Sequence, residues 1–170
     1  MIEFFIIALL ILSAATLFRL IVIDLKYFLL PDTHTMLLAI CGVSLHALTQ
    51  WRFCLPLDAI AGAALGGGML LIVRFFANLY YKQDALGLGD VKLMAACGLW
   101  LGHQDISLAI AIGALCGVIH GTFIAYLTKR KEGKWPSMQH LGVPAGPGFI
   151  VGFVIIALVK LRALPLFLFS

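Results

Sequence analysis

Six apolar stretches occupy most of the chain, and short polar segments separate each stretch from the next. They run from about Ile2 to Ile23, His34 to Leu48, Leu57 to Leu79, Val91 to Leu101, Ile106 to Thr128 and Val143 to Leu161. Because 62% of the 170 residues are hydrophobic and only 12% are charged, the chain lacks the polar surface of a soluble domain. We therefore expect an all-α, polytopic membrane helix bundle of about six transmembrane helices, forming a single domain over residues 1–170.

The apolar stretches differ in length, and length decides whether a helix can cross a bilayer. A helix needs roughly 20 residues to cross the hydrocarbon core of a bilayer. The second and fourth stretches are shorter than that, so they would cross fully only if neighbouring residues extended them. Small residues also recur every fourth position, at Gly62 and Gly66 and again at Gly113, Gly117 and Gly121, a spacing that favours close helix packing in lipid.

Positive charges divide unevenly between the two ends of such a bundle. If successive segments alternate in direction, one end receives Lys26, Lys82, Lys92, Lys129, Arg130, Lys131 and Lys134, and the other receives Arg52, Lys160 and Arg162. Cytoplasmic loops carry the excess of lysine and arginine in membrane proteins. We therefore expect a multi-pass protein of the inner (plasma) membrane with the first end in the cytosol. The net charge of +4 then reflects this bias and contact with membrane lipid, and no nucleic-acid partner is expected.

An aspartate ends the first apolar stretch. Asp24 directly follows Leu20–Ile23, so its carboxylate should lie at or just inside the membrane boundary. Ionisable groups at that depth are costly and usually face a cavity or a partner. The alternative is that Asp24 only marks the end of a helix among the lipid headgroups, paired with Lys26. Shortly afterwards Pro31 should break the helix, and Asp32 adds a further carboxylate.

A second aspartate follows two glycines in the segment Leu86-Gly87-Leu88-Gly89-Asp90, directly before a helical pattern. Glycines allow unwound backbone with positive φ, and they leave room for another part of the chain to approach closely. Aspartate is also a favoured N-cap residue, so a simple helix cap is the alternative reading of Asp90.

The two aspartates share a pattern and a predicted location. Both begin an Asp-x-Lys motif, Asp24-Leu25-Lys26 and Asp90-Val91-Lys92, and both fall at the same predicted end of the bundle. Two nearby carboxylates cannot both ionise easily, so such a pair can hold one proton between them. The ionised member can take a proton from water that attacks a peptide carbonyl, while the protonated member donates to the developing oxyanion. This pattern indicates aspartyl proteolysis.

That chemistry requires neither a metal nor another cofactor. The four cysteines, Cys41, Cys54, Cys97 and Cys116, form no C-x-x-C pair, and no histidine lies at ligand spacing from them. We therefore expect no metal site and no cofactor.

These motifs resemble those of the type IV prepilin peptidases, membrane aspartyl proteases with a GxGD motif. The resemblance rests on Ile23–Lys26 with Leu30-Pro31-Asp32, on Gly87–Lys92, and on Val143–Gly148, which is similar to the proline–glycine stretch that opens the last helix in that family. It implies that Asp24 and Asp90 are the catalytic pair. Supporting or substrate-binding roles would fall to Lys26, Asp32, Gly87, Gly89 and Lys92.

The resemblance also implies a substrate. Such enzymes remove the short basic leader of type IV pilin-like precursors (prepilins, pseudopilins or Flp-type pilins) after a glycine, at the cytosolic membrane face. Their partners are the pilin precursor and the machinery of pilus assembly or type II secretion. Longer members carry an amino-terminal domain with paired C-x-x-C cysteines and also methylate the new amino terminus. Because this sequence lacks those pairs, we expect the short, peptidase-only form, without that zinc/methyltransferase domain and without N-methyltransferase activity.

Three hypotheses stay open at this point. Asp84, close to Asp90 in the sequence, could help to bind the positive charge of the leader. The alternative function is a small proton-coupled transporter or channel that uses the aspartates as a relay, which would place ionisable groups near the bilayer midplane. A scaffold subunit of a secretion machine would leave both aspartates dispensable.

Overall fold

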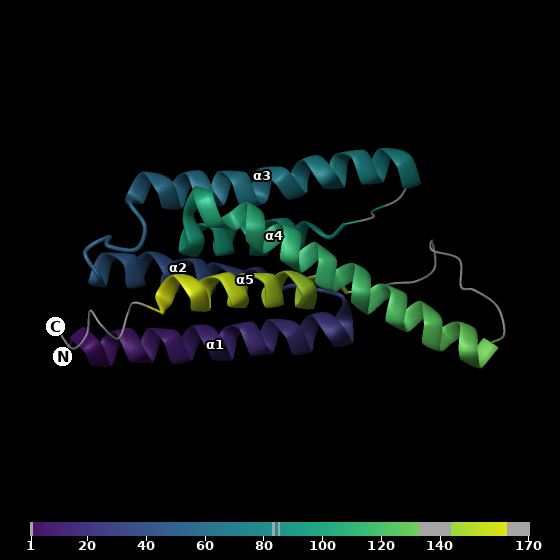
Figure 1. Ribbon diagram of the computed structural model, residues 1–170, viewed down its shortest axis with the longest axis horizontal. Helices are drawn as coiled ribbons and strands as arrows, with labels where there is room; N and C mark the ends of the chain where they lie inside the picture. Colours follow the sequence, from purple (N-terminus) through teal and green to yellow (C-terminus); the bar gives the residue numbers. More distant parts are fainter. Residues whose placement is uncertain (1, 83, 85, 133–143, 163–170) are drawn as a thin grey trace.

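The computed structural model has five helices and describes residues 2–82, 84, 86–132 and 144–162. The helices are α1 (Ile2–Tyr27), α2 (Asp32–Leu48), α3 (Pro56–Tyr81), α4 (Leu88–Glu132) and α5 (Gly146–Leu161). Figure 1 shows most of them lying side by side along one long axis. No strand occurs within the described ranges, which confirms the all-α expectation.

Three of the helices are long and apolar enough to cross a membrane. These are α1, α3 and α4, whose most apolar windows have mean hydropathies of 2.7, 1.8 and 2.1. Their outer faces expose large apolar side chains such as Phe4, Phe75 and Val118, as expected of surfaces that contact lipid. The bundle is therefore compatible with a membrane, and a total of six transmembrane crossings stays a prediction.

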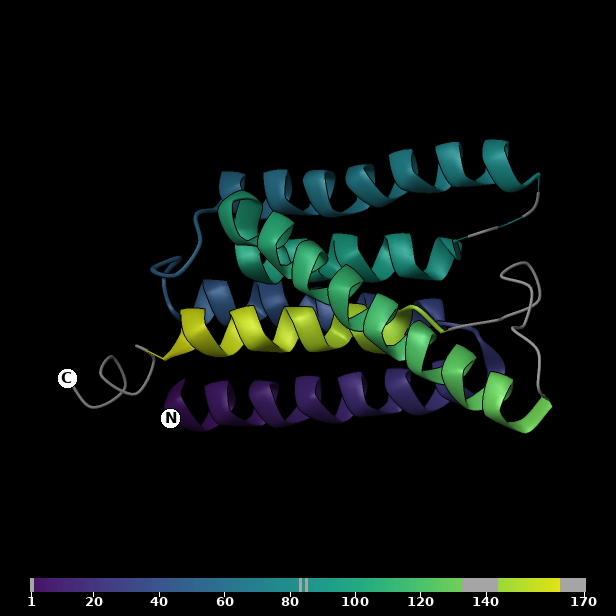
Figure 2. The ribbon, with the colours of Figure 1, turned by 45° about the vertical axis from the view of Figure 1, so that its right-hand side comes forward.

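The fourth and fifth apolar stretches form two helical arms, which meet at a kink and together make up α4. Within α4, Gly102 has φ 74° and ψ 177°, which is not helical. Only glycine adopts this combination readily, because it has no Cβ. The chain reverses direction there, and Figure 2 shows the two arms of α4 diverging from the turn. The sequence placed the interruption correctly but did not indicate that a single residue makes it.

This arrangement gathers several helix ends at one end of the bundle. In Figure 2 the end of α1, the start of α2, the end of α3 and the start of α4 all lie toward the right. Asp24 and Asp90 therefore lie at the same end, as the alternation of segments predicted. The assignment of that end to the cytosol stays a prediction. Lys134 and Val143 lie outside the described residues.

Glycines let α3 and α4 approach each other closely. A Cβ on Gly62 would meet the carbonyl oxygen of Gly98, and one on Gly66 would meet the carbonyl oxygen of Met94. On the other arm of α4, a Cβ on Gly113 would lie 2.8 Å from the Cα of Phe149 in α5. The expected role of these small residues in helix packing is confirmed at Gly62, Gly66 and Gly113.

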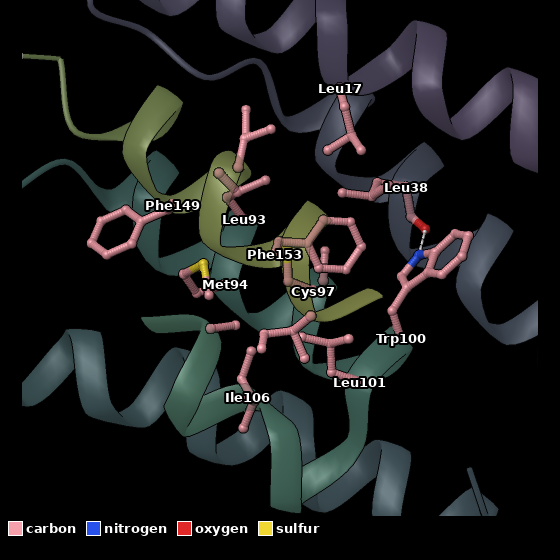
Figure 3. Packing of buried hydrophobic residues seen from close by; sticks show 14 of the residues in the cluster. Leu17, Leu38, Leu93, Met94, Cys97, Trp100, Leu101, Ile106, Phe149 and Phe153 are labelled. Atoms are coloured by element: carbon pink, nitrogen blue, oxygen red, sulfur yellow. Dashed lines mark hydrogen bonds between the residues drawn. The ribbon is translucent and has the colours of Figure 1, made fainter. Parts of the chain in front are cut away.

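A tryptophan ties three helices together in the core. The indole N–H of Trp100 in α4 donates to the carbonyl of Leu38 in α2 at 2.8 Å, as Figure 3 shows. Its ring packs edge-on against Phe153 of α5, with centroids 6.0 Å apart. All three residues are buried. The core thus fixes α2 and α5 against the first arm of α4, the arm that begins near Asp90.

Candidate active site

Asp24 is buried in the last turns of α1, with 5% of its surface exposed. Its Oδ2 accepts a hydrogen bond from the backbone N–H of Gly146 at 3.1 Å. Gly146 is the first residue of α5, so Asp24 satisfies one of the N–H groups that a helix leaves unpaired at its start. The negative carboxylate also faces the positive end of that helix. Nζ of Lys26 lies 5.0 Å from the centroid of the Tyr27 ring. Among the residues that the structure describes, Lys26 and Asp24 form no ion pair.

The absence of a side chain at Gly146 makes this contact possible. A Cβ at that position would lie 2.6 Å from Oδ2 of Asp24 and 3.1 Å from its Cγ. The carboxylate would have to move if any other residue stood there. The proline–glycine stretch that opens α5 therefore shapes the surroundings of Asp24, in addition to starting the helix.

Asp90 is buried in the first turn of α4, with 8% of its surface exposed. It is the third residue of the helix, and its Oδ2 faces Gly87, the residue that precedes the helix: a Cβ on Gly87 would lie 3.2 Å from that oxygen. A carboxylate in the first turn lies at the positive end of the helix. Asp90 therefore stands inside the first turn of α4, and the simpler reading of Asp90 as the N-cap residue is wrong.

One oxygen of Asp90 has no partner. Its Oδ1 is buried and accepts no hydrogen bond from any residue that the structure describes. A buried acceptor without a partner costs about 1–3 kcal/mol, so an atom of this kind calls for an explanation.

Leu30 lies beside two glycines that neighbour the aspartates, Gly89 next to Asp90 and Gly146 next to Asp24. A Cβ on Gly89 would come within 2.8 Å of the Leu30 Cβ, and a Cβ on Gly146 would lie 3.3 Å from Leu30 Cδ1. Gly89 thus serves the close approach expected of it. The other expectation, positive φ at Gly87 and Gly89, is wrong: among the described glycines only Gly102 has positive φ.

Gly146, which donates to Asp24, and Gly89, which directly precedes Asp90, both approach Leu30. The structure thus brings Asp24, Asp90, Gly87 and Gly89 together at one end of the bundle, around the buried Leu30. Residues from α1, from the connection before α2, from the start of α4 and from the start of α5 all contribute to this arrangement.

Asp32 and Lys92 form a separate ion pair near the surface. Lys92 Nζ lies 2.7 Å from each carboxylate oxygen of Asp32, and both side chains are more than half exposed. The pair borders a groove of about 380 Å³ between α2, α3 and α4. The groove is otherwise lined by Thr35, Met36, Ala39, Ala63, Ala95, Ala96 and Leu99. Asp32 therefore forms an ion pair with Lys92.

Leu30 and Gly146 belong to recognised motifs, but their individual contacts, and the role of Arg74, were not predicted from the sequence. Arg74 lies in α3 and reaches the segment before Asp90, where it donates to the Leu86 carbonyl. An arginine inside a long apolar segment was the one signal that could have identified it. No group of three or more histidine, cysteine, aspartate or glutamate side chains suited to a metal ion occurs among the residues placed by the structure.

Comparisons with known proteins agree on one family. A model of the type IV leader peptidase family matches residues 5–122, a range that contains both Asp24 and Asp90. The chain is 35% identical over 109 residues to a prepilin leader peptidase/N-methyltransferase of Escherichia coli K12, covering 64% of this chain and 48% of the relative. It is 32% identical over 140 residues to the leader peptidase HopD of Salmonella typhimurium, covering 76% of this chain and 82% of HopD.

The coverage of these relatives differs. A type 4 prepilin-like proteins leader peptide-processing enzyme of Escherichia coli O78:H11 is 34% identical over 112 residues, which make up 39% of its length. The chain thus spans less than half the length of several curated relatives that it matches. No solved structure matches it. The family match covers most of the described helices and both buried aspartates, and the chain therefore belongs to the type IV leader peptidase family.

Proposed function

We propose that this protein is a membrane aspartyl endopeptidase that removes the leader of type IV pilin-like precursors, with Asp24 and Asp90 as its catalytic pair. The observation that carries the proposal is that two buried carboxylates stand at one end of an apolar helix bundle, each beside a glycine that approaches Leu30. Burying two acids is costly, and stability alone gives no reason for it. Family membership supports the same activity.

The chemistry follows from a pair that shares one proton. The ionised carboxylate takes a proton from a water molecule, and the resulting hydroxide attacks the scissile carbonyl carbon. The protonated carboxyl donates its hydrogen to the carbonyl oxygen as negative charge develops there. A proton then passes to the leaving nitrogen, the C–N bond breaks, and a new carboxylate and a new amine are released.

The surroundings of each acid suit this division of work. Oδ2 of Asp24 is held by the Gly146 N–H, and Oδ2 of Asp90 lies beside Gly87, 3.2 Å from where a Cβ would stand. These contacts orient both groups before a substrate arrives, which is how an enzyme lowers the entropy cost of reaching the transition state. Oδ1 of Asp90 accepts nothing from the described residues and is available to the attacking water or the substrate carbonyl.

The proposed substrate has a basic leader followed by an apolar helix, and cleavage after a glycine would occur at the cytosolic face of the inner membrane. The excess of lysine at the end that holds Asp24 and Asp90 supports this orientation. The names of the relatives, prepilin leader peptidase and leader peptidase, support the substrate class.

The decisive experiment is cleavage of a pilin-like precursor by the purified protein in detergent or lipid. Asp24→Asn and Asp90→Asn should each lower kcat by several powers of ten, because each removes part of the acid–base function. Circular dichroism and thermal unfolding should show that both variants keep the fold.

Asp58→Asn is the matched control. Asp58 lies in α3 at the other end of the bundle, where its Oδ1 is 3.2 Å from Nδ1 of His103. Its loss should leave cleavage close to that of the parent protein. Undiminished cleavage by a folded Asp24→Asn or Asp90→Asn variant would refute the assignment of the catalytic pair. A parent protein that cuts no pilin-like precursor, but moves protons across vesicles, would favour the transporter.

A further inference from the structure

We propose that Arg74 is a positioning residue for Asp90, which it holds through the peptide group that joins Leu86 to Gly87. This inference rests on the proposed function, because it concerns the alignment of one member of the catalytic pair. Arg74 belongs to a different helix from Asp90, and nothing in the Asp-x-Lys or GxGD patterns indicates it.

The contacts of Arg74 converge on the segment before α4. Its guanidinium donates through Nη1 to the carbonyl of Leu86 and through Nη2 to Oδ1 of Asp84 at 2.6 Å. Asn78, one helical turn further along α3, donates to the same Asp84 oxygen at 3.0 Å. The side chain of Arg74 is only 18% exposed, whereas that of Asp84 is 78% exposed. The buried contact of Arg74 is therefore the one with Leu86.

The carbonyl of Leu86 and the N–H of Gly87 belong to one planar peptide group. In such a group the two point in opposite directions. Arg74 holds the carbonyl side, and Gly87, on the N–H side, lies beside Oδ2 of Asp90, which is 3.2 Å from where a Cβ on Gly87 would stand. Fixing one side of a rigid plane fixes the other, so Arg74 determines where the N–H points. A charged donor on the carbonyl also polarises the peptide and strengthens the bond that its N–H makes.

Arginine suits this task better than lysine. Its planar fork presents several N–H donors in fixed directions, so that it can serve two acceptors together, whereas lysine has a single flexible ammonium. An ionisable side chain inside a membrane-spanning helix is also expensive unless it has a specific partner. The Leu86 carbonyl is a backbone acceptor that persists whatever side chain stands at that position.

Asp84 binds Arg74, which is a different role from binding the positive charge of the leader. One of its oxygens already accepts from both Arg74 and Asn78, so it neutralises and orients the guanidinium. Positioning and leader binding predict different kinetics for variants at these residues. Loss of positioning lowers kcat with little change in KM, whereas loss of a leader-binding charge raises KM.

The test is steady-state cleavage of a pilin-like precursor by the full-length protein and its Arg74→Met, Arg74→Lys and Asp84→Asn variants. Arg74→Met keeps a long side chain without donors, and it should lower kcat roughly 10- to 100-fold with KM within about twofold of the parent value. Arg74→Lys should recover part of the loss, because one ammonium can reach the Leu86 carbonyl. Asp84→Asn should lower kcat less than Arg74→Met does, with KM near the parent value, because the Leu86 contact survives without the carboxylate that orients the guanidinium.

The outcomes separate this inference from the proposed function. If the parent protein cuts the precursor and Asp90→Asn does not, the function stands; unchanged kcat in a folded Arg74→Met variant then overturns only the positioning role. A rise in KM at constant kcat also overturns it. If Arg74→Met fails to fold, Arg74→Lys carries the test, and a kcat equal to that of the parent refutes the inference.

Discussion

The carboxylate of Asp24 accepts a hydrogen bond from the N–H of Gly146, 3.1 Å away, although the two residues are 122 positions apart in the sequence. The first helix and the last helix thus meet at the proposed catalytic pair. We predict that Gly146→Ala lowers kcat by about two orders of magnitude, because the new Cβ would lie 2.6 Å from Oδ2 and push the carboxylate aside. Cleavage kinetics with a pilin-like precursor measure the effect.

Gly68→Ala is the control for that substitution. A Cβ on Gly68 in α3 would meet no atom within 4 Å, and alanine favours a helix over glycine. This variant should keep the parent kcat and unfold at the same or a slightly higher temperature. Equal kcat values for the two alanine variants would mean that the position of Asp24 tolerates the extra methyl group.

The ion pair between Asp32 and Lys92 predicts that the Asp32 carboxylate is not needed for cleavage. Both side chains are more than half exposed, and exposed ion pairs contribute about 0–1 kcal/mol to stability. Asp32→Asn should therefore unfold close to the parent temperature and keep kcat within a few-fold. Loss of cleavage comparable to that of Asp90→Asn would place Asp32 in the catalytic pair and remove Asp24 or Asp90 from it.

The reversal in α4 depends on Gly102. Its φ of 74° and ψ of 177° belong to a region that only glycine occupies at little cost, and other residues there cost about 1–3 kcal/mol. A Cβ would also come within 2.8 Å of Cys54 Sγ. Gly102→Ala should therefore lower the free energy of unfolding by at least that amount, measured in detergent. A variant as stable as the parent would show that the reversal tolerates a side chain.

The bond between Trp100 and Leu38 should contribute measurably to stability. Trp100→Phe keeps an aromatic ring against Phe153 but removes the indole N–H that donates to the Leu38 carbonyl at 2.8 Å. We expect a loss of about 1 kcal/mol, the usual net contribution of one intramolecular hydrogen bond. Gly42→Ala should destabilise more, because its Cβ would overlap the indole ring itself. The reverse order would argue against the packing seen around Trp100.

Local features of the fold could be predicted from the sequence. Long apolar runs specify helices in a bilayer, so the expected stretches and the helices agree closely for α1, α2 and α3. Pro31 was expected to end the first helix, and α1 does end just before it. Alternating direction then placed Asp24 and Asp90 at one end, because each crossing of the bundle returns the chain to a known side.

Contacts between distant residues could not be predicted in this way. Asp32 pairs with Lys92 and Asp24 accepts from Gly146 because three-dimensional packing brings their helices together, and nothing local in the sequence encodes either choice. The single-residue reversal at Gly102 was equally hidden, since a glycine between two apolar runs is compatible with a loop, a kink or a packing site.

The hydrogen bond between Asp24 and the start of α5 also affects when, during synthesis, the site can form. Ribosomes build a chain from its amino terminus, so Asp24 enters the membrane long before Gly146 exists. Until the last helix arrives, this acid has no donor from α5 to hold it in place. A chain that has not yet reached α5 lacks this contact, so newly made copies would gain the proposed ability to cut only after α5 has been made.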